Sequence, residues 1–105
     1  MELEHLQKQV EWFACSHGLE ADVEARLLDL VSEVGELSKE TLKASAYGSK
    51  DFRPTGTWHS EMGDVLYSLV CLANATGVDL EAALKEALTK YEARLAKQGD
   101  AGSGR

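Results

Sequence analysis

Apolar side chains recur along most of the chain with the spacing of an amphipathic α-helix. This periodicity predicts four helices, at about residues 2–16, 20–46, 57–76 and 80–97. The apolar stripe of the first helix consists of Leu3, Leu6, Val10 and Phe13. The stripe of the second helix consists of Val23, Leu27, Leu30, Val31, Val34 and Leu37. The chain is therefore predicted to be all-α, with one helical domain at residues 1–97.

Glycine and aspartate mark short connections between some of these helices. Gly18 follows the first helix as a stop, Gly77 closes the third helix, and Asp79 is placed to cap the fourth. Short connections favour antiparallel neighbours, so we expect the first two helices to form one hairpin and the last two another. The single proline, Pro54, lies in the longer connection at residues 47–57. The Gly-rich tail, residues 98–105, has no apolar anchor and is predicted to be disordered.

Length and charge limit the classes of partner. A chain of 105 residues forms one domain with a thin core, so we expect a four-helix bundle that is completed by oligomerisation. The net charge of -7 argues against nucleic acid or an anionic membrane surface as the main partner. No apolar run approaches the roughly 20 residues of a membrane span, and the N-terminal segment lacks the apolar stretch of a signal peptide. We expect a soluble, cytoplasmic protein whose Cys15 and Cys71 are buried thiols in a reducing compartment.

One local pattern occurs twice: an acid, an apolar residue, a glycine and a second acid. The second predicted helix contains it as Glu33-Val34-Gly35-Glu36, and the third contains it as Glu61-Met62-Gly63-Asp64. Residues three apart on a helix project from the same side, so each segment presents two carboxylates together. If these two helices pack side by side, four carboxylates converge.

An ordinary solvated face is the alternative for the first pair. Asp29, Glu33, Glu36 and Glu40 fall within a wedge of roughly 60° on the second helix, opposite its apolar stripe. The third helix differs, because residues 65–78 carry no charge and predict a largely buried helix. Carboxylates at the start of such a helix are costly unless they are paired or bind cations, although the helix dipole also favours acids there.

The ligand types select among metals. Sites built from oxygen alone suit magnesium, manganese or calcium. Zinc is disfavoured because neither acid pair contains histidine or cysteine, and a di-iron site would need Glu-x-x-His pairs that are absent here. Four carboxylates around a triphosphate bring together about eight negative charges, which one divalent ion cannot offset. Two or three magnesium ions would be needed for such a substrate.

The motifs SEVGELSKE, EMGDVLY and NATGVDLEAAL together resemble the all-α nucleoside triphosphate pyrophosphohydrolases typified by MazG, over about residues 27–97. The resemblance implies magnesium-dependent hydrolysis of a nucleoside triphosphate, often a deoxynucleotide, to the monophosphate and pyrophosphate; manganese could replace magnesium. It implies a homodimer or homotetramer and a role in cleansing the nucleotide pool. The implied metal ligands are Glu33, Glu36, Glu61 and Asp64, and an activated water would attack the α-phosphorus.

The sequence also departs from the family pattern. Ser32 stands where the family often has a further glutamate, which leaves Glu36 or Glu33 as the candidate general base. Lys90 and Arg94 match the family's C-terminal segment only in part; they are candidate phosphate contacts or surface cations. These departures keep open a non-catalytic nucleotide-binding or protein-interaction module of the same fold, and a helical adaptor whose acids are only surface.

Other candidate contacts with the nucleotide lie outside the acid pairs. Asn74 is a candidate hydrogen-bonding partner, or a polar residue near the end of its helix, and Trp58 could stack on a base or serve as a core or interface anchor. Lys50, Arg53 and His59 lie in or beside the loop before the third helix. They could contact phosphate, although surface residues of a mobile loop are the ordinary interpretation.

Overall fold

Four α-helices make up the fold in the computed structural model, which describes residues 2–99. They are α1 (Leu3–Ser16), α2 (Val23–Ala44), α3 (Trp58–Ala75) and α4 (Leu80–Gln98). The all-α prediction is confirmed, and the predicted helix bounds differ from the observed ones by at most three residues. The predicted disorder of the tail concerns residues that, from 100 onward, lie outside the described part of the chain.

Capping side chains fix where α2 and α4 begin. The Asp22 carboxylate accepts a hydrogen bond of 2.8 Å from the backbone N–H of Ala25. The Asp79 carboxylate accepts bonds of 3.0 and 3.2 Å from the N–H groups of Glu81 and Ala82, as the sequence predicts. Each cap satisfies backbone donors that the first helical turn leaves without a partner.

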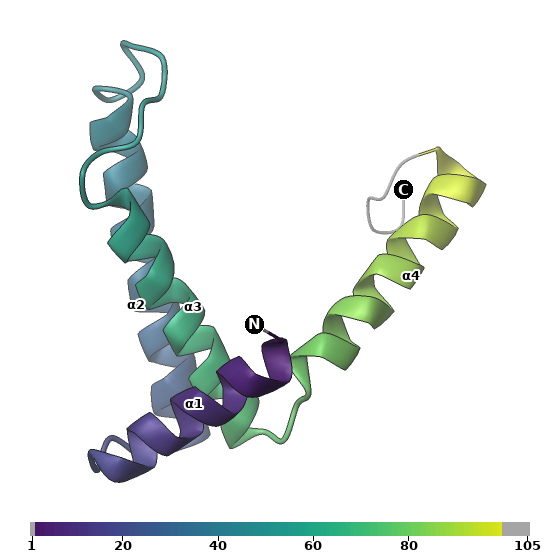
Figure 1. Ribbon diagram of the computed structural model, residues 1–105. Helices are drawn as coiled ribbons and strands as arrows, with labels where there is room; N and C mark the ends of the chain where they lie inside the picture. The colour runs from purple at the N-terminus through teal and green to yellow at the C-terminus, as the bar shows by residue number, and fades with distance from the viewer. Residues whose placement is uncertain (1, 100–105) are drawn as a thin grey trace.

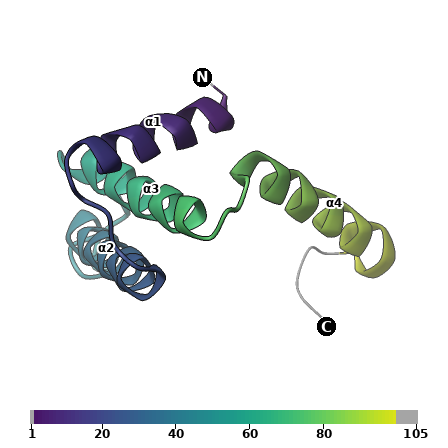
Figure 2. The ribbon, with the colours of Figure 1, turned by 90° about the horizontal axis from the view of Figure 1, so that it is seen from below.

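The central helix is α3, which packs along α2 on one side and is crossed by α1 on the other (Figures 1 and 2). The fourth helix packs against α1 and projects away from the α2–α3 pair (Figure 2). The predicted hairpins are therefore wrong. The antiparallel pair is α2 with α3, which are joined by the longest connection. The chain bends by 102° between α3 and α4, so these two helices do not lie along each other. Burial of the uncharged surface of α3, rather than loop length, decides which helices pair.

A polar junction at Gln7 holds the turn between α3 and α4. The Gln7 side chain donates to the Asn74 side chain at 3.1 Å and to the Val78 carbonyl at 2.8 Å, and it accepts from the Leu80 N–H at 2.8 Å. Gly77 supplies the left-handed conformation that the turn needs, with φ of +70°. Because α1 supplies these bonds, α4 is directed onto α1 instead of folding back along α3.

The core is small and much apolar surface remains open. The buried apolar residues are Ala14, Val70, Cys71 and Ala73, all on α1 or α3. The large apolar residues that are at least half exposed are Trp12, Leu27, Leu28, Val31, Tyr47, Leu84, Leu88 and Leu95. Cys71 is buried as predicted, but Cys15 is exposed because it lies on a part of α1 that no other element covers.

The long connection between α2 and α3 is folded back onto the end of α2. Ala46 and Tyr47 have positive φ values of 48° and 60°, followed by Gly48 at +87°, so the chain reverses sharply after Ala44. This reversal ends α2 two residues before the predicted end at residue 46. Within the described residues, no single helix is long and apolar enough to cross a membrane, and α3 and α4 meet that standard only as a strongly bent pair.

Candidate metal centre

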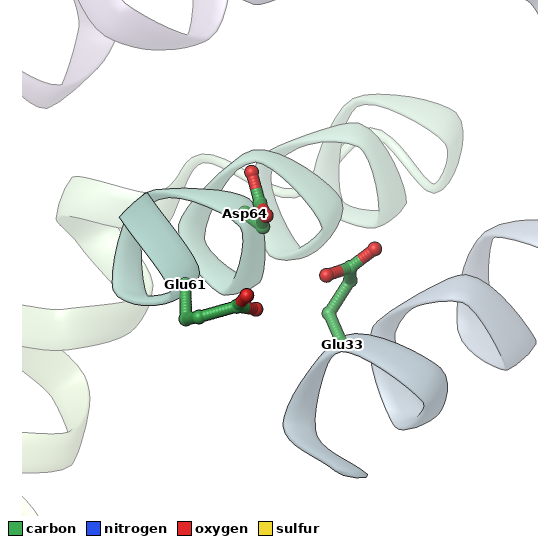
Figure 3. Close-up of side chains that lie close together, drawn as sticks. All are labelled: Glu33, Glu61 and Asp64. Carbon is green, nitrogen blue, oxygen red and sulfur yellow. The ribbon is translucent and has the colours of Figure 1, made fainter. Parts of the chain in front are cut away.

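Three of the four predicted ligands come together between α2 and α3. Glu33 projects from α2, and Glu61 and Asp64 project from α3 toward it (Figure 3). One carboxylate oxygen of each residue lies within 4.8 Å of the others. α2 and α3 pack side by side in opposite directions (Figure 1). This packing places Glu33 beside Glu61 and Asp64, so three of the four carboxylates of the repeated sequence pattern converge.

The cluster carries concentrated negative charge. Glu33 and Glu61 are half-buried, whereas Asp64 is exposed. Partial burial raises the pKa of Glu61 above its ordinary value, and the nearby carboxylate of Asp64 raises that pKa further. Glu40, Glu36 and Glu33 act in the same direction. No ion pair joins Glu33, Glu61 or Asp64 to a cationic side chain within residues 2–99. A bound cation would relieve this repulsion.

The fourth predicted ligand, Glu36, lies beside the cluster but is not one of its three closely spaced members. Its exposed carboxylate is 3.8 Å from the ammonium group of Lys39 on the next turn. Glu36 still contributes to the raised pKa of Glu61, so its charge reaches the centre.

Glu40 has a role that sequence reasoning missed. Its two carboxylate oxygens accept hydrogen bonds from the Thr55 hydroxyl at 3.0 Å and the Thr57 hydroxyl at 2.7 Å. These bonds lower the pKa of Glu40 below its ordinary value, the bond from Thr57 having the larger effect. In the sequence, Glu40 is only one more acid of the polar face of α2. The sequence feature that could have indicated this role is the pair of hydroxyl donors, Thr55 and Thr57, just before α3.

The glycines between the acids leave the backbone of both helices open. A Cβ atom added at Gly35 or at Gly63 would meet no other atom within 4 Å. Packing within this chain therefore does not require glycine at either position. Each mid-helix glycine lowers helix stability by roughly 0.5–1 kcal/mol relative to alanine. No contact within this chain compensates for that loss at Gly35 or Gly63.

The predicted nucleotide contacts do not gather at the cluster within one chain. Asn74 lies ten residues beyond Asp64 on α3, and its amide exchanges hydrogen bonds of 3.0 and 3.1 Å with Gln7. This placement favours a structural role for Asn74 over the predicted contact with nucleotide. Lys90 and Arg94 lie on α4, over the ring of Tyr91.

Trp58 begins α3, three residues before Glu61, and so lies at the end of the helix that carries the acids. Its ring is half-buried and packs edge-on against Phe52 of the preceding loop, with the ring centres 5.0 Å apart. The pair anchors the loop at the end of α3 that carries the acids.

Comparison with known protein families identifies the arrangement. The family model described as the MazG nucleotide pyrophosphohydrolase domain matches residues 22–98, which include both acid pairs. This chain belongs to the MazG family. The resemblance stated from the sequence motifs is thereby confirmed, and the MazG match spans α2, α3 and α4 but not α1.

A curated relative of this MazG domain has no assigned activity. The uncharacterized protein YpjD of Bacillus subtilis (strain 168) is 37% identical over 73 residues, which are 67% of this chain and 64% of the relative. The chain thus spans less than two thirds of the length of that relative. No solved structure matches the chain.

Proposed function

We propose that this MazG domain is a magnesium-dependent nucleoside triphosphate pyrophosphohydrolase. The observation that carries the proposal is the convergence of Glu33, Glu61 and Asp64 within 4.8 Å, in a chain of the MazG nucleotide pyrophosphohydrolase family. An all-carboxylate ligand set with no histidine or cysteine fits Mg²⁺, and Mn²⁺ as a substitute. Bound Mg²⁺ would offset the charge of the phosphates and acidify the attacking water.

In this proposal the acids divide into metal ligands and a base. Glu33, Glu61 and Asp64 hold the metal, and Glu36 completes the set or accepts the proton of the attacking water; Glu33 is the second candidate for the base. The water oxygen forms a bond to the α-phosphorus, and the bond from that phosphorus to the bridging oxygen of the β-phosphate breaks. The products are a nucleoside monophosphate and pyrophosphate. The physiological role would be removal of unwanted nucleotides from a cytoplasmic pool.

We also propose that the working form is a homodimer or a homotetramer of this chain. Leu84, Leu88 and Leu95 form a row on α4 that is about half exposed, and Leu28 on α2 is 69% exposed. Apolar surface on this scale is typical of protein–protein interfaces. A monomeric mass by light scattering at micromolar concentration would remove this part of the proposal.

The second candidate function is a nucleotide-binding or protein-interaction module without turnover. Ser32 favours it, because the family often has a glutamate at that position that could serve as base or outer ligand. The enzyme and a nucleotide-binding module both predict binding of nucleotide, whereas a protein-interaction module does not. Only turnover separates the enzyme from a nucleotide-binding module.

The deciding experiment is pyrophosphate release from a panel of canonical and damaged dNTPs and NTPs, with magnesium and with EDTA. We expect magnesium-dependent release of equal amounts of pyrophosphate and monophosphate from at least one nucleotide. The variant Asp64→Asn should lose this activity and keep its helical circular dichroism. Absence of release from a folded, magnesium-loaded sample would favour the non-catalytic module.

A further inference from the structure

The connection between α2 and α3 forms an open hollow that is lined by cations. The hollow has a volume of about 560 Å³. Its lining residues are Lys43, Ala44, Ala46, Ser49, Lys50, Asp51 and Arg53. Three cationic side chains and one carboxylate give it a net positive charge, in a chain whose net charge is -7. Positive potential is therefore concentrated where the rest of the surface is mostly negative.

Hydrogen bonds fix the backbone of two of these cationic residues. The Lys50 N–H donates to the Ser45 carbonyl at 3.0 Å, and the Arg53 N–H donates to the Ala44 carbonyl at 2.9 Å. These bonds are possible because the positive φ values of Ala46 and Tyr47 turn the chain back over the end of α2. Lys50 and Arg53 are thus brought beside Lys43 by a defined loop conformation.

The hollow lies at the end of the helix pair that carries the acids. Lys43 is ten residues after Glu33, which corresponds to roughly 15 Å along α2. Glu40 lies between them and is bound by Thr55 and Thr57, so the loop is fastened to α2 next to the acid cluster. A triphosphate is shorter than this separation, so the long side chains of Lys43, Lys50 and Arg53 must extend from the hollow to meet phosphates that are held at the acids.

We propose that the hollow binds the terminal phosphates of the nucleotide and then the departing pyrophosphate, through Lys43, Lys50 and Arg53. The acid cluster repels a triphosphate wherever metal ions do not bridge to it, whereas ammonium and guanidinium groups bind phosphate oxygens directly. The ligand chemistry is a pyrophosphate group, which is present both in free pyrophosphate and at the end of a nucleoside triphosphate. This inference rests on the proposed function for its biological meaning but not for its test.

The test measures binding without turnover. Inorganic pyrophosphate is titrated into the full chain in EDTA at low salt, and amide chemical shifts and calorimetric affinity are recorded. We expect the shifts to be largest for residues 43–53. The variant K50Q/R53Q should bind pyrophosphate roughly tenfold more weakly or worse, because charge-assisted phosphate contacts are lost. The control K8Q/K85Q also removes two exposed lysine charges, on α1 and α4, and should bind as the wild type does.

Other results would overturn the inference. Equal pyrophosphate affinity in K50Q/R53Q and K8Q/K85Q would do so. So would a lower melting temperature of K50Q/R53Q with unchanged affinity, because the cations would then serve only to complement the negative end of the α2 dipole. A nucleoside monophosphate should leave these amides unshifted, and equal shifts with monophosphate would remove the assignment to terminal phosphates.

A turnover measurement separates this inference from the proposed function. If the wild type binds pyrophosphate at residues 43–53 but hydrolyses no nucleotide, the pyrophosphate site is supported and the proposed activity is wrong. If the wild type hydrolyses a nucleotide while K50Q/R53Q keeps the same KM and the same inhibition by pyrophosphate, the proposed activity is supported and the pyrophosphate site is wrong.

Discussion

Glu40 on α2 and Thr57 at the start of α3 are joined by a hydrogen bond of 2.7 Å, donated by the threonine hydroxyl to a carboxylate oxygen. Thr55 donates to the other oxygen of the same carboxylate. The ionised form of Glu40 thus fastens the long α2–α3 connection to the helix pair. This arrangement connects the conformation of the loop to the charge of one side chain near the candidate metal centre.

Stability should therefore depend on the ionisation of Glu40. The pKa of Glu40 in the folded state lies below its ordinary value of 4.5, so folding favours the ionised form. Its stabilising effect is fully present above pH 4.5 and is lost as the pH falls through the lower, folded-state pKa. We expect Glu40→Gln to lose stability at pH 7 and to show a shallower decline below pH 4.5 than the wild type. Urea unfolding at a series of pH values measures both effects.

A control for Glu40 is Glu24→Gln, which removes an exposed acid from the first turn of the same helix. Its loss of stability at pH 7 should be smaller than that of Glu40→Gln. If Glu40→Gln and Glu24→Gln behave alike, the bonds from Thr55 and Thr57 do not contribute to stability.

The contact between Gln7 and Asn74 should contribute to stability rather than to nucleotide binding. Asn74→Ala removes two hydrogen bonds to Gln7, and we expect it to cost about 1–3 kcal/mol of unfolding free energy. A double-mutant cycle with Gln7→Ala, measured by urea unfolding, should show coupling from the 3.1 Å bond between the two side chains. The bond from the Asn74 amide to the Gln7 backbone carbonyl does not need the Gln7 side chain and does not contribute to this coupling. An Asn74→Ala variant of wild-type stability with a raised KM would instead support the nucleotide contact predicted from the sequence.

Magnesium should raise the melting temperature if it binds at the acid cluster. A ligand that binds only the folded state stabilises it by RT ln(1 + [L]/Kd). We expect Glu33→Gln to abolish the rise in melting temperature that magnesium gives the wild type. The matched control is Asp29→Asn, an exposed acid one turn earlier on the same polar face of α2. An equal response to magnesium in both variants would mean that the cluster does not select a cation.

Alanine at Gly63 should separate stability from activity. Because a Cβ atom there meets nothing within 4 Å, Gly63→Ala should stabilise the protein by about 0.5–1 kcal/mol through helix propensity. If a phosphate group or a second chain approaches this open backbone, the same variant should lose turnover or oligomer mass. Urea unfolding, pyrophosphate release and light scattering on one preparation make the comparison. A variant that is more stable and fully active would show that neither a phosphate group nor a second chain packs against the backbone at Gly63.

The sequence by itself determined the four helices and three members of the candidate metal centre. Helical periodicity and the cap at Asp79 are local properties, so they could be located without knowledge of the packing. The cap at Asp22 is equally local but was not predicted. The two acid pairs predicted convergence because three-residue spacing fixes which side of a helix a carboxylate occupies.

Only the tertiary structure decided which helices pair and what the polar residues do. Loop lengths predicted two hairpins, but burial of α3 against α2 and the Gln7 junction set the pairing instead, and both depend on contacts between distant parts of the chain. For the same reason the sequence could not distinguish Glu40, held by two loop threonines, from Glu36, which lies exposed at the edge of the cluster. Residues on one polar face look alike in sequence, and they acquire different roles only when another segment folds against them.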